Sequence, residues 1–232
     1  MATERTAPKR QVRPPTPYGA YLTAIWGARA IFEACGLSIV GSEYVPRRGA
    51  AVLMGNHVSY FDPLLVIQLT RGRPVNYIAK EELFEVWNGW LFPRLNCIPV
   101  RRGSADLAVF RAAARTLAQG RLMGLFPEGT RTDGHLGRAQ HGSLAIAIRA
   151  GVPIIPVGLA GTLEMLPREG GFRPEPAAVE AGPPLLLPAA WSARRLAPWQ
   201  LDRVGARLMD EIARLRARCQ ARCDAARAAG RV

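Results

Sequence analysis

The sequence predicts an α/β fold, with a mainly parallel central sheet flanked by helices. About half of the 232 residues are hydrophobic (49%), a proportion that suits one domain with a sizeable core. Short, continuously apolar segments of strand length alternate along the chain with segments of helical periodicity, which is typical of parallel strands joined by helical crossovers. The predicted strands are residues 50–56, 74–79, 97–100, 121–126 and 152–159.

The first predicted strand, residues 50–56 (AAVLMGN), has no polar alternation, as expected for a strand buried on both faces. The clearest predicted helix spans residues 104–120, where Ser104 can cap the start and Gly120 the end. A further strand is predicted near residues 177–181, and residues 199–227 form an apolar-faced, arginine-rich C-terminal helix. We therefore assign residues 41–232 to one α/β domain.

Two N-terminal segments precede this domain. Residues 1–17 contain four basic residues, one acid and four prolines, which predicts a flexible basic tail. Residues 18–40 are apolar but include Arg29, which a spanning helix would place near the bilayer centre at about 2.5–3.5 kcal/mol. We therefore expect a membrane-interface helix, with Tyr18, Tyr21, Trp26 and Phe32 at the headgroup boundary. The alternatives are a helix packed on the core and a secretory signal cleaved near residues 28–30.

The net charge of +13 predicts an anionic partner, which could be nucleic acid, an acidic lipid surface or a phosphorylated substrate. Four cysteines are too few and too scattered for a disulfide framework and suggest a reducing compartment. Cys219 and Cys223 lie four residues apart on a predicted helix, but two ligands do not make a metal site, so we expect no bound metal.

A histidine and an aspartate follow the first predicted strand, in NHVSYFDPL (residues 56–64). Asp62 precedes Pro63, so it is predicted to cap a helix that has Pro63 in its first position, which leaves His57 on the strand-to-helix turn. An imidazole can accept a proton near neutral pH, and a carboxylate on its other nitrogen orients it. The pair is therefore a candidate general base, although one such spacing is a weak signal.

A second polar turn, FPEGTRT (residues 126–132), follows the strand predicted at 121–126. Glu128 and Gly129 bring a carboxylate and a bare backbone to this turn, and Arg131 adds a guanidinium suited to phosphate. The alternative is that Glu128 and Arg131 pair with each other. Arg102 follows another strand, and a further turn follows the strand predicted at 152–159. Open α/β sheets bind ligands at the carboxyl ends of their strands, so these four groups are predicted to share one crevice. Together they suit acyl transfer to the hydroxyl of a phosphorylated alcohol.

Four blocks of the sequence, NHVSYFDPL, IPVRRG, FPEGTRT and GVPIIPVGLAGT, resemble the ordered motifs of the phospholipid/glycerol acyltransferase family, over about residues 39–162. The resemblance implies transfer of a fatty acyl group from acyl-CoA or acyl-carrier protein to lysophosphatidic acid, giving phosphatidic acid. It also implies a peripheral or monotopic place at the cytoplasmic face of the membrane. One departure is that Gln140 and His141 stand where many members carry a lysine, which bears on the identity of the acceptor.

The resemblance also implies roles for individual residues. His57 deprotonates the acceptor and Asp62 orients His57, while Arg102 and the turn of Glu128, Gly129, Thr130 and Arg131 bind the glycerol phosphate. The acyl or donor side is formed by Val152, Pro153, Ile154, Ile155 and Pro156.

The sequence lacks a Walker loop, a dinucleotide fingerprint and a G-x-S-x-G elbow, so we expect no cofactor besides the thioester co-substrate and no acyl-enzyme. Two alternatives stay open. One is the same chemistry on glycerol 3-phosphate or a lyso-aminolipid. The other is a non-catalytic basic protein that binds nucleic acid or membrane. That alternative does not explain why the motifs gather at the ends of strands. We therefore expect no nucleic-acid partner.

Overall fold

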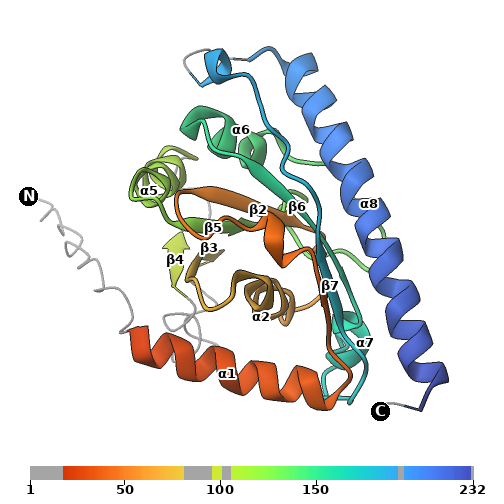
Figure 1. Ribbon diagram of the computed structural model, residues 1–232. Coiled ribbons are helices and arrows are strands. Elements are labelled where there is room, and N and C mark those ends of the chain that lie inside the picture. Colours follow the sequence, from red (N-terminus) through yellow and green to blue (C-terminus); the bar gives the residue numbers. More distant parts are fainter. Residues whose placement is uncertain (1–17, 81–95, 101–105, 193–195, 231–232) are drawn as a thin grey trace, which may run out of the picture.

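The computed structural model describes residues 18–80, 96–100, 106–192 and 196–230, and within them the predicted mainly parallel sheet is confirmed (Figure 1). Seven strands lie in the order β1-β7-β6-β2-β5-β3-β4. All neighbours pair in parallel except β6 and β7, which are antiparallel. The strands are β1 (Ser38–Val40), β2 (Ala51–Gly55), β3 (Val75–Lys80), β4 (Cys97–Val100), β5 (Leu122–Leu125), β6 (Ile154–Ala160) and β7 (Ala178–Ala181).

Helices cover both faces of this sheet. The α-helices are α1 (Tyr18–Ala34), α2 (Asp62–Ile67), α5 (Asp106–Ala118), α6 (His141–Ala150), α7 (Thr162–Met165) and α8 (Pro198–Ala228). Short 3-10 turns occur at η1 (Ser42–Tyr44), η2 (Gln68–Thr70) and η3 (Ala189–Trp191). Figure 1 shows α1 and α2 on one side of the sheet, α5 and α6 on the other, and the long α8 running beside β6 and β7.

The central strand β2 explains why its sequence is continuously apolar. Ala51 and Leu53 pack into the core on the α1 and α2 side, whereas Val52 and Met54 pack into the core on the α5, α6 and α8 side. All four side chains are at most 1% exposed. A strand covered on both faces has no position at which a polar side chain would reach water, so the alternation seen in half-exposed strands is absent.

The helix α1 is part of the core, and this corrects the expected position of two of its aromatic residues. Tyr21 and Phe32 are only 1% and 2% exposed and pack against α2 and the sheet, so they do not face a headgroup layer. Trp26 and Ile31 project outward, 64% and 51% exposed. Among the described helices, none has both the length and the hydropathy needed to cross a membrane. The predicted tail, residues 1–17, lies outside the described residues.

The C-terminal helix α8 is attached to the sheet by apolar packing and by ion pairs. Gly158 in β6 allows the close approach, because a Cβ there would lie 2.3 Å from the backbone nitrogen of Arg216. Glu180 in β7 accepts hydrogen bonds from Arg218 and Arg222. The predicted metal-ligand candidates Cys219 and Cys223 are buried against this strand pair, and burial raises the pKa of Cys219 to about 12.

Candidate active site

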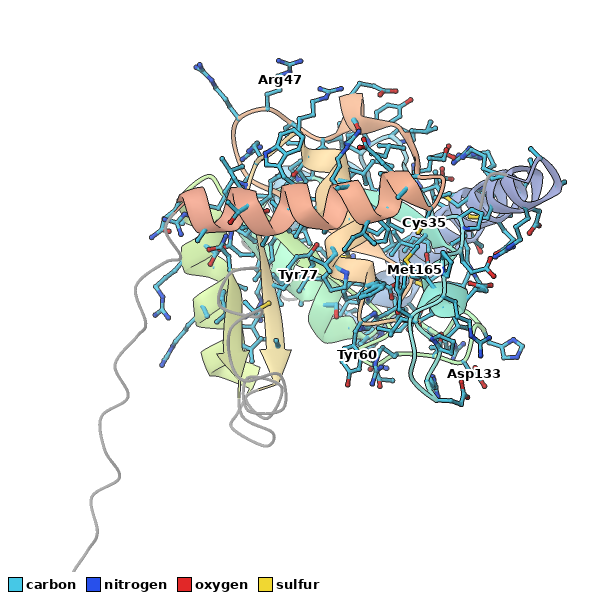
Figure 2. All side chains as sticks on the ribbon, turned by 90° about the horizontal axis from the view of Figure 1, so that it is seen from below. Cys35, Arg47, Tyr60, Tyr77, Asp133 and Met165 are labelled. Carbon is cyan, nitrogen blue, oxygen red and sulfur yellow. The ribbon has the colours of Figure 1, made fainter. Side chains whose placement is uncertain are left out.

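The carboxyl ends of three neighbouring strands meet at one edge of the sheet. Met54, near the end of β2, lies beside Leu125, the last residue of β5, and beside Pro156 in β6, which continues to Ala160. His57 follows β2, Glu128 follows β5 and Thr162 follows β6; Thr132 bonds to His57 and Thr162 to Asp62, which confirms the predicted convergence of these three turns. Figure 2 shows Tyr60 and Asp133 at this edge and Arg47, which precedes β2, on the opposite side of the molecule.

The histidine and aspartate form a hydrogen-bonded pair. The Nδ1 atom of His57 lies 2.7 Å from Oδ2 of Asp62, which is completely buried. The same Oδ2 accepts the backbone N–H groups of Val58 and Ser59 at 2.7 and 2.8 Å, and Oδ1 accepts the hydroxyl of Thr162 at 2.5 Å. Since an ionised carboxylate only accepts, Nδ1 carries the proton and Nε2 keeps its lone pair. The imidazole is therefore arranged as a base at Nε2.

The predicted role of Asp62 as a helix cap is wrong. The helix α2 begins at Asp62 itself, its N-cap residue is Phe61, and its N-terminus has no side-chain cap. The carboxylate of Asp62 instead turns back to the N–H groups of the preceding turn, because two amides and the imidazole converge on it there. Pro63 is the second residue of the helix, one position later than predicted.

Aromatic side chains hold the imidazole from one side. The ring of His57 stacks on Phe126 at 4.0 Å between centroids, and Phe126 stacks on Tyr77 at 6.2 Å. Gly124 makes room for this stack, because a Cβ at that position would lie 2.2 Å from the Tyr77 ring. The side chain of His57 is 18% exposed, so it is held by packing but still open to a substrate. The hydroxyl of Tyr77 donates to the carbonyl of Pro63 at 3.0 Å.

The turn after β5 is tied to the backbone of His57. Gly129 adopts a left-handed conformation (φ 75°) and donates to the carbonyl of Phe126 at 3.0 Å. The N–H of Thr132 donates to the carbonyl of His57 at 2.8 Å. Thr130 is exposed at the tip of the turn. This arrangement brings the second predicted polar turn to the catalytic pair.

Glu128 lies beneath this turn, and its carboxylate does not reach the surface. The residue is 6% exposed, and neither carboxylate oxygen has a hydrogen-bond partner of good geometry among the described residues. Burial raises its pKa to about 7, opposed in part by the Thr132 side chain and the His57 backbone. This buried position suits a carboxyl group that supports the turn. The sequence had predicted that Glu128 contacts an acceptor directly.

Arg131 does not pair with Glu128, the alternative left open by the sequence. Its guanidinium instead lies over the ring of Tyr60, with Cζ 3.6 Å from the ring centroid. Arg168, from the segment after α7, donates to the carbonyl of Arg131 at 3.4 Å. Two guanidinium groups therefore lie at the rim of the site, beside the residues that follow His57.

The predicted acyl or donor segment is not at this edge. Val152 and Pro153 precede β6, and Ile154, Ile155 and Pro156 form its amino end, where both isoleucines are completely buried core residues. Parallel strands bring their carboxyl ends together, so it is the carboxyl end of β6 that approaches His57 and Asp62. The structure does not bring these five residues to His57, and their role on the acyl or donor side stays a prediction. Arg102 lies outside the described residues, and its role stays a prediction.

The sequence analysis missed two residues that join β2 to the end of β6. The amide of Asn56 donates to the carbonyl of Leu159 at 3.1 Å and accepts its N–H at 2.9 Å. Thr162, two residues past β6, reaches Asp62. The predicted turn after residues 152–159 covers the place of Thr162 but does not single out this residue. No sequence signal marks the contact between Tyr60 and Arg131.

Gln140 and His141, which stand where the family resemblance predicts a lysine, lie at the start of α6. The N–H of Gln140 donates to the carbonyl of Pro127 at 2.8 Å, which ties α6 to the turn of Glu128. The Nε2 atom of His141 lies 2.8 Å from a carboxylate oxygen of Asp202 in α8. His141 therefore links two helices through an exposed pair.

A family model described as Acyltransferase matches residues 36–160, more than half of the sequence. The chain belongs to this family. The matched residues include the pair of His57 and Asp62 and the turn of Glu128 to Arg131, and they end just before Thr162.

Curated relatives and a solved structure share this similarity. The chloroplastic 1-acyl-sn-glycerol-3-phosphate acyltransferase LPAT1 of Arabidopsis thaliana is 28% identical over 152 residues, 63% of this chain and 42% of its own length. The lyso-ornithine lipid O-acyltransferase of Pseudomonas aeruginosa is 35% identical over 149 residues, covering 62% and 55%. The crystal structure of the 1-acyl-sn-glycerophosphate (LPA) acyltransferase PlsC from Thermotoga maritima has a TM-score of 0.59 at 24% identity, covering 84% of this chain and 88% of that one. The matched region spans about half the length of the curated relatives, and the structural similarity supports the fold.

We expect Thr162→Val to destabilise the fold through Asp62. The valine keeps the shape but leaves Oδ1 of a buried carboxylate without a donor, which lowers the free energy of unfolding by about 2–3 kcal/mol. Thr162→Ser keeps the hydroxyl and loses one methyl group, at about 0.8 kcal/mol. Urea denaturation of the three proteins measures the difference. A valine variant as stable as the serine variant would show that the hydrogen bond contributes nothing.

We expect the buried carboxyl group of Glu128 to make stability depend on pH. Its pKa is raised from 4.5 to about 7 in the fold, so the folded state holds a proton that the unfolded chain releases, and stability falls as pH rises between these values. Glu128→Gln removes the ionisable group. Relative to the parent, the variant should gain about 1–3 kcal/mol of unfolding free energy between about pH 5 and about pH 8. Urea denaturation at both pH values checks this, and a difference independent of pH would contradict it.

Proposed function

We propose that this protein transfers a fatty acyl group from a thioester donor, acyl-CoA or acyl-carrier protein, to the free hydroxyl of lysophosphatidic acid, forming phosphatidic acid. The observation that carries the proposal is the His57 and Asp62 pair, which leaves Nε2 as a base, with the guanidinium of Arg131 on Tyr60 of the same turn. Membership of the acyltransferase family and the names of the 1-acyl-sn-glycerol-3-phosphate acyltransferase relatives support it.

The reaction follows from the protonation state of the pair. Nε2 of His57 takes the proton of the acceptor hydroxyl as its oxygen attacks the thioester carbonyl carbon, and the imidazolium is stabilised by Asp62. The tetrahedral intermediate then expels the thiolate as the carbon–sulfur bond breaks, and the imidazolium returns its proton to the leaving sulfur. The acyl group passes directly from donor to acceptor, and the enzyme ends in its starting state. Positioning the two substrates against each other supplies the rest of the acceleration.

One relative favours a second candidate for the acceptor. The Pseudomonas aeruginosa enzyme, 35% identical over the shared region, is named for a lyso-ornithine lipid, a lyso-aminolipid. The arrangement around Arg131 favours a phosphomonoester, because the guanidinium has no carboxylate partner among the described residues and matches phosphate geometry. Glycerol 3-phosphate offers the same phosphate without an acyl chain.

We also place the protein on the surface of an anionic membrane, at the cytoplasmic face, where a lysophospholipid would be available. Trp26 and Ile31 project from α1 into solvent, and the chain carries a net charge of +13. Indole and aliphatic side chains enter the headgroup boundary, and cationic residues are attracted to anionic lipid. This supports peripheral attachment through the outer side of α1, while its inner side stays in the core.

His57→Ala should lower the turnover number for acyl transfer by about 100- to 10,000-fold, because the acceptor loses its base. His135→Ala is the matched control, since His135 is exposed in the loop after the Glu128 turn and should change nothing. Product formation is followed by mass spectrometry with acyl-CoA and acyl-carrier protein against lysophosphatidic acid, glycerol 3-phosphate and lyso-ornithine lipid. Turnover of the His57 variant within tenfold of the parent would reject the base, and a preference for lyso-ornithine lipid would favour the second candidate.

Trp26→Ser should reduce sedimentation with vesicles that contain phosphatidylglycerol, because it removes an indole from the membrane-facing side of α1. Trp199→Ser in α8 is the control, since both tryptophans are 64% exposed. Vesicles of phosphatidylcholine alone test the contribution of lipid charge. Equal loss of binding in both variants would show that α1 is not the attachment site.

A further inference from the structure

The connection between α7 and β7 carries features that the family motifs do not include. It lies beyond residues 36–160, the region matched by the family model, and brings Arg168 and Phe172 to the rim of the site. We infer that two side chains of the segment 166–175 bind the lysophospholipid acceptor: Arg168 joins Arg131 on its phosphate, and Phe172 contacts its acyl chain. This inference rests on the proposed function and names the residues that select the acceptor.

Hydrogen bonds before and within the segment hold it in place. Before it, Thr162 in α7 donates to the catalytic carboxylate of Asp62. Within it, the N–H of Arg173 donates to the carbonyl of Met165 at 2.9 Å, and Gly170 donates to Pro167 at 3.1 Å. These bonds fold the segment back over α7, so its side chains are presented beside the catalytic turn. In Figure 2, Met165, Tyr60 and Asp133 lie on the same side of the molecule.

The cationic half of the proposed site is a pair of arginines that lack a counterion. Arg168 donates to the backbone carbonyl of Arg131, whose own guanidinium lies on the face of Tyr60. Among the described residues, neither arginine forms an ion pair, whereas Arg218 and Arg227 both bind carboxylates. A phosphate dianion would accept charge-assisted hydrogen bonds from both guanidinium groups.

The apolar half is a row of three phenylalanine rings. Phe172 is 51% exposed, and its ring centroid lies 6.3 Å from that of Phe61, the residue before Asp62. Phe61 in turn meets Phe32 of α1 edge to face at 6.2 Å. Phe172 is therefore the surface end of an apolar row that continues through Phe61 to Phe32, which is buried on the inner side of α1.

The two halves match the two ends of one molecule. A lysophospholipid carries its phosphate only a few bonds from the free hydroxyl, and its acyl chain extends the other way. Arg131 lies on Tyr60 and Phe172 lies against Phe61, and both partners belong to the same turn as His57, so an acceptor held by Arg131, Arg168 and Phe172 would have its hydroxyl near His57. The segment therefore selects an acceptor that is both anionic and acylated, which disfavours glycerol 3-phosphate and lyso-aminolipids.

Steady-state kinetics of the full chain with acyl-CoA and oleoyl lysophosphatidic acid tests the phosphate half. Arg168→Gln should raise the KM for lysophosphatidic acid about tenfold while kcat and the KM for acyl-CoA stay within about twofold. Arg173→Gln is the control, because it removes the same charge from the same exposed segment. Equal effects of the two variants, or a rise confined to the KM for acyl-CoA, would overturn the assignment of Arg168.

Acyl-chain dependence tests the apolar half. Phe172→Ser should raise the KM for oleoyl lysophosphatidic acid about tenfold and leave the KM for a hexanoyl analogue nearly unchanged. Equal effects on both KM values would overturn the role of Phe172.

Calorimetric titration of lysophosphatidic acid below its micelle concentration separates this inference from the proposed function. Weaker binding by Arg168→Gln than by Arg173→Gln supports the segment even if turnover is absent. Equal binding refutes it even if the parent is active.

Discussion

The buried carboxylate of Asp62 is the interaction on which the rest of the site depends. A carboxylate without exposed surface is unfavourable unless donors replace its lost hydration, and here His57, two backbone amides and Thr162 supply them. Because two of these donors are rigid backbone groups, they fix the orientation of the carboxylate and thereby the tautomer of His57. The link to Thr162 joins positions 100 residues apart. The hydrogen bonds that stabilise the buried carboxylate of Asp62 are therefore the same bonds that orient His57.

The sheet supplies the frame for that carboxylate. The register that sets β2 beside β5 and β6 brings three strand ends to one edge, and the amide of Asn56 holds the end of β2 against Leu159. Below the imidazole, Gly124 leaves the space that the Tyr77 and Phe126 stack occupies. The buried carboxyl group of Glu128 is the exception to this well-satisfied packing, since it is desolvated without a good hydrogen-bond partner among the described residues.

Elements outside the region shared with the family shape what the core chemistry can act on. The inner side of α1 completes the core, while its outer side leaves Trp26 exposed. The connection after α7 adds Arg168 and Phe172 beside the catalytic turn. Along the other edge, α8 is attached to β7 through Glu180. Variation in such segments would change the acceptor or the membrane contact without disturbing the pair of His57 and Asp62.

The sequence by itself determined the parallel sheet, the placement of His57 and Glu128 after strands and the spacing of the catalytic pair. It could do so because a strand covered on both faces must be apolar throughout, and because the five-residue span from His57 to Asp62 is a local turn. Only the tertiary structure decided that Asp62 binds Thr162, that Arg131 lies on Tyr60 instead of pairing with Glu128, and that Ile154 and Ile155 are core residues. These outcomes depend on strand direction, register and burial between segments distant in sequence, and no local pattern of residues encodes such distances.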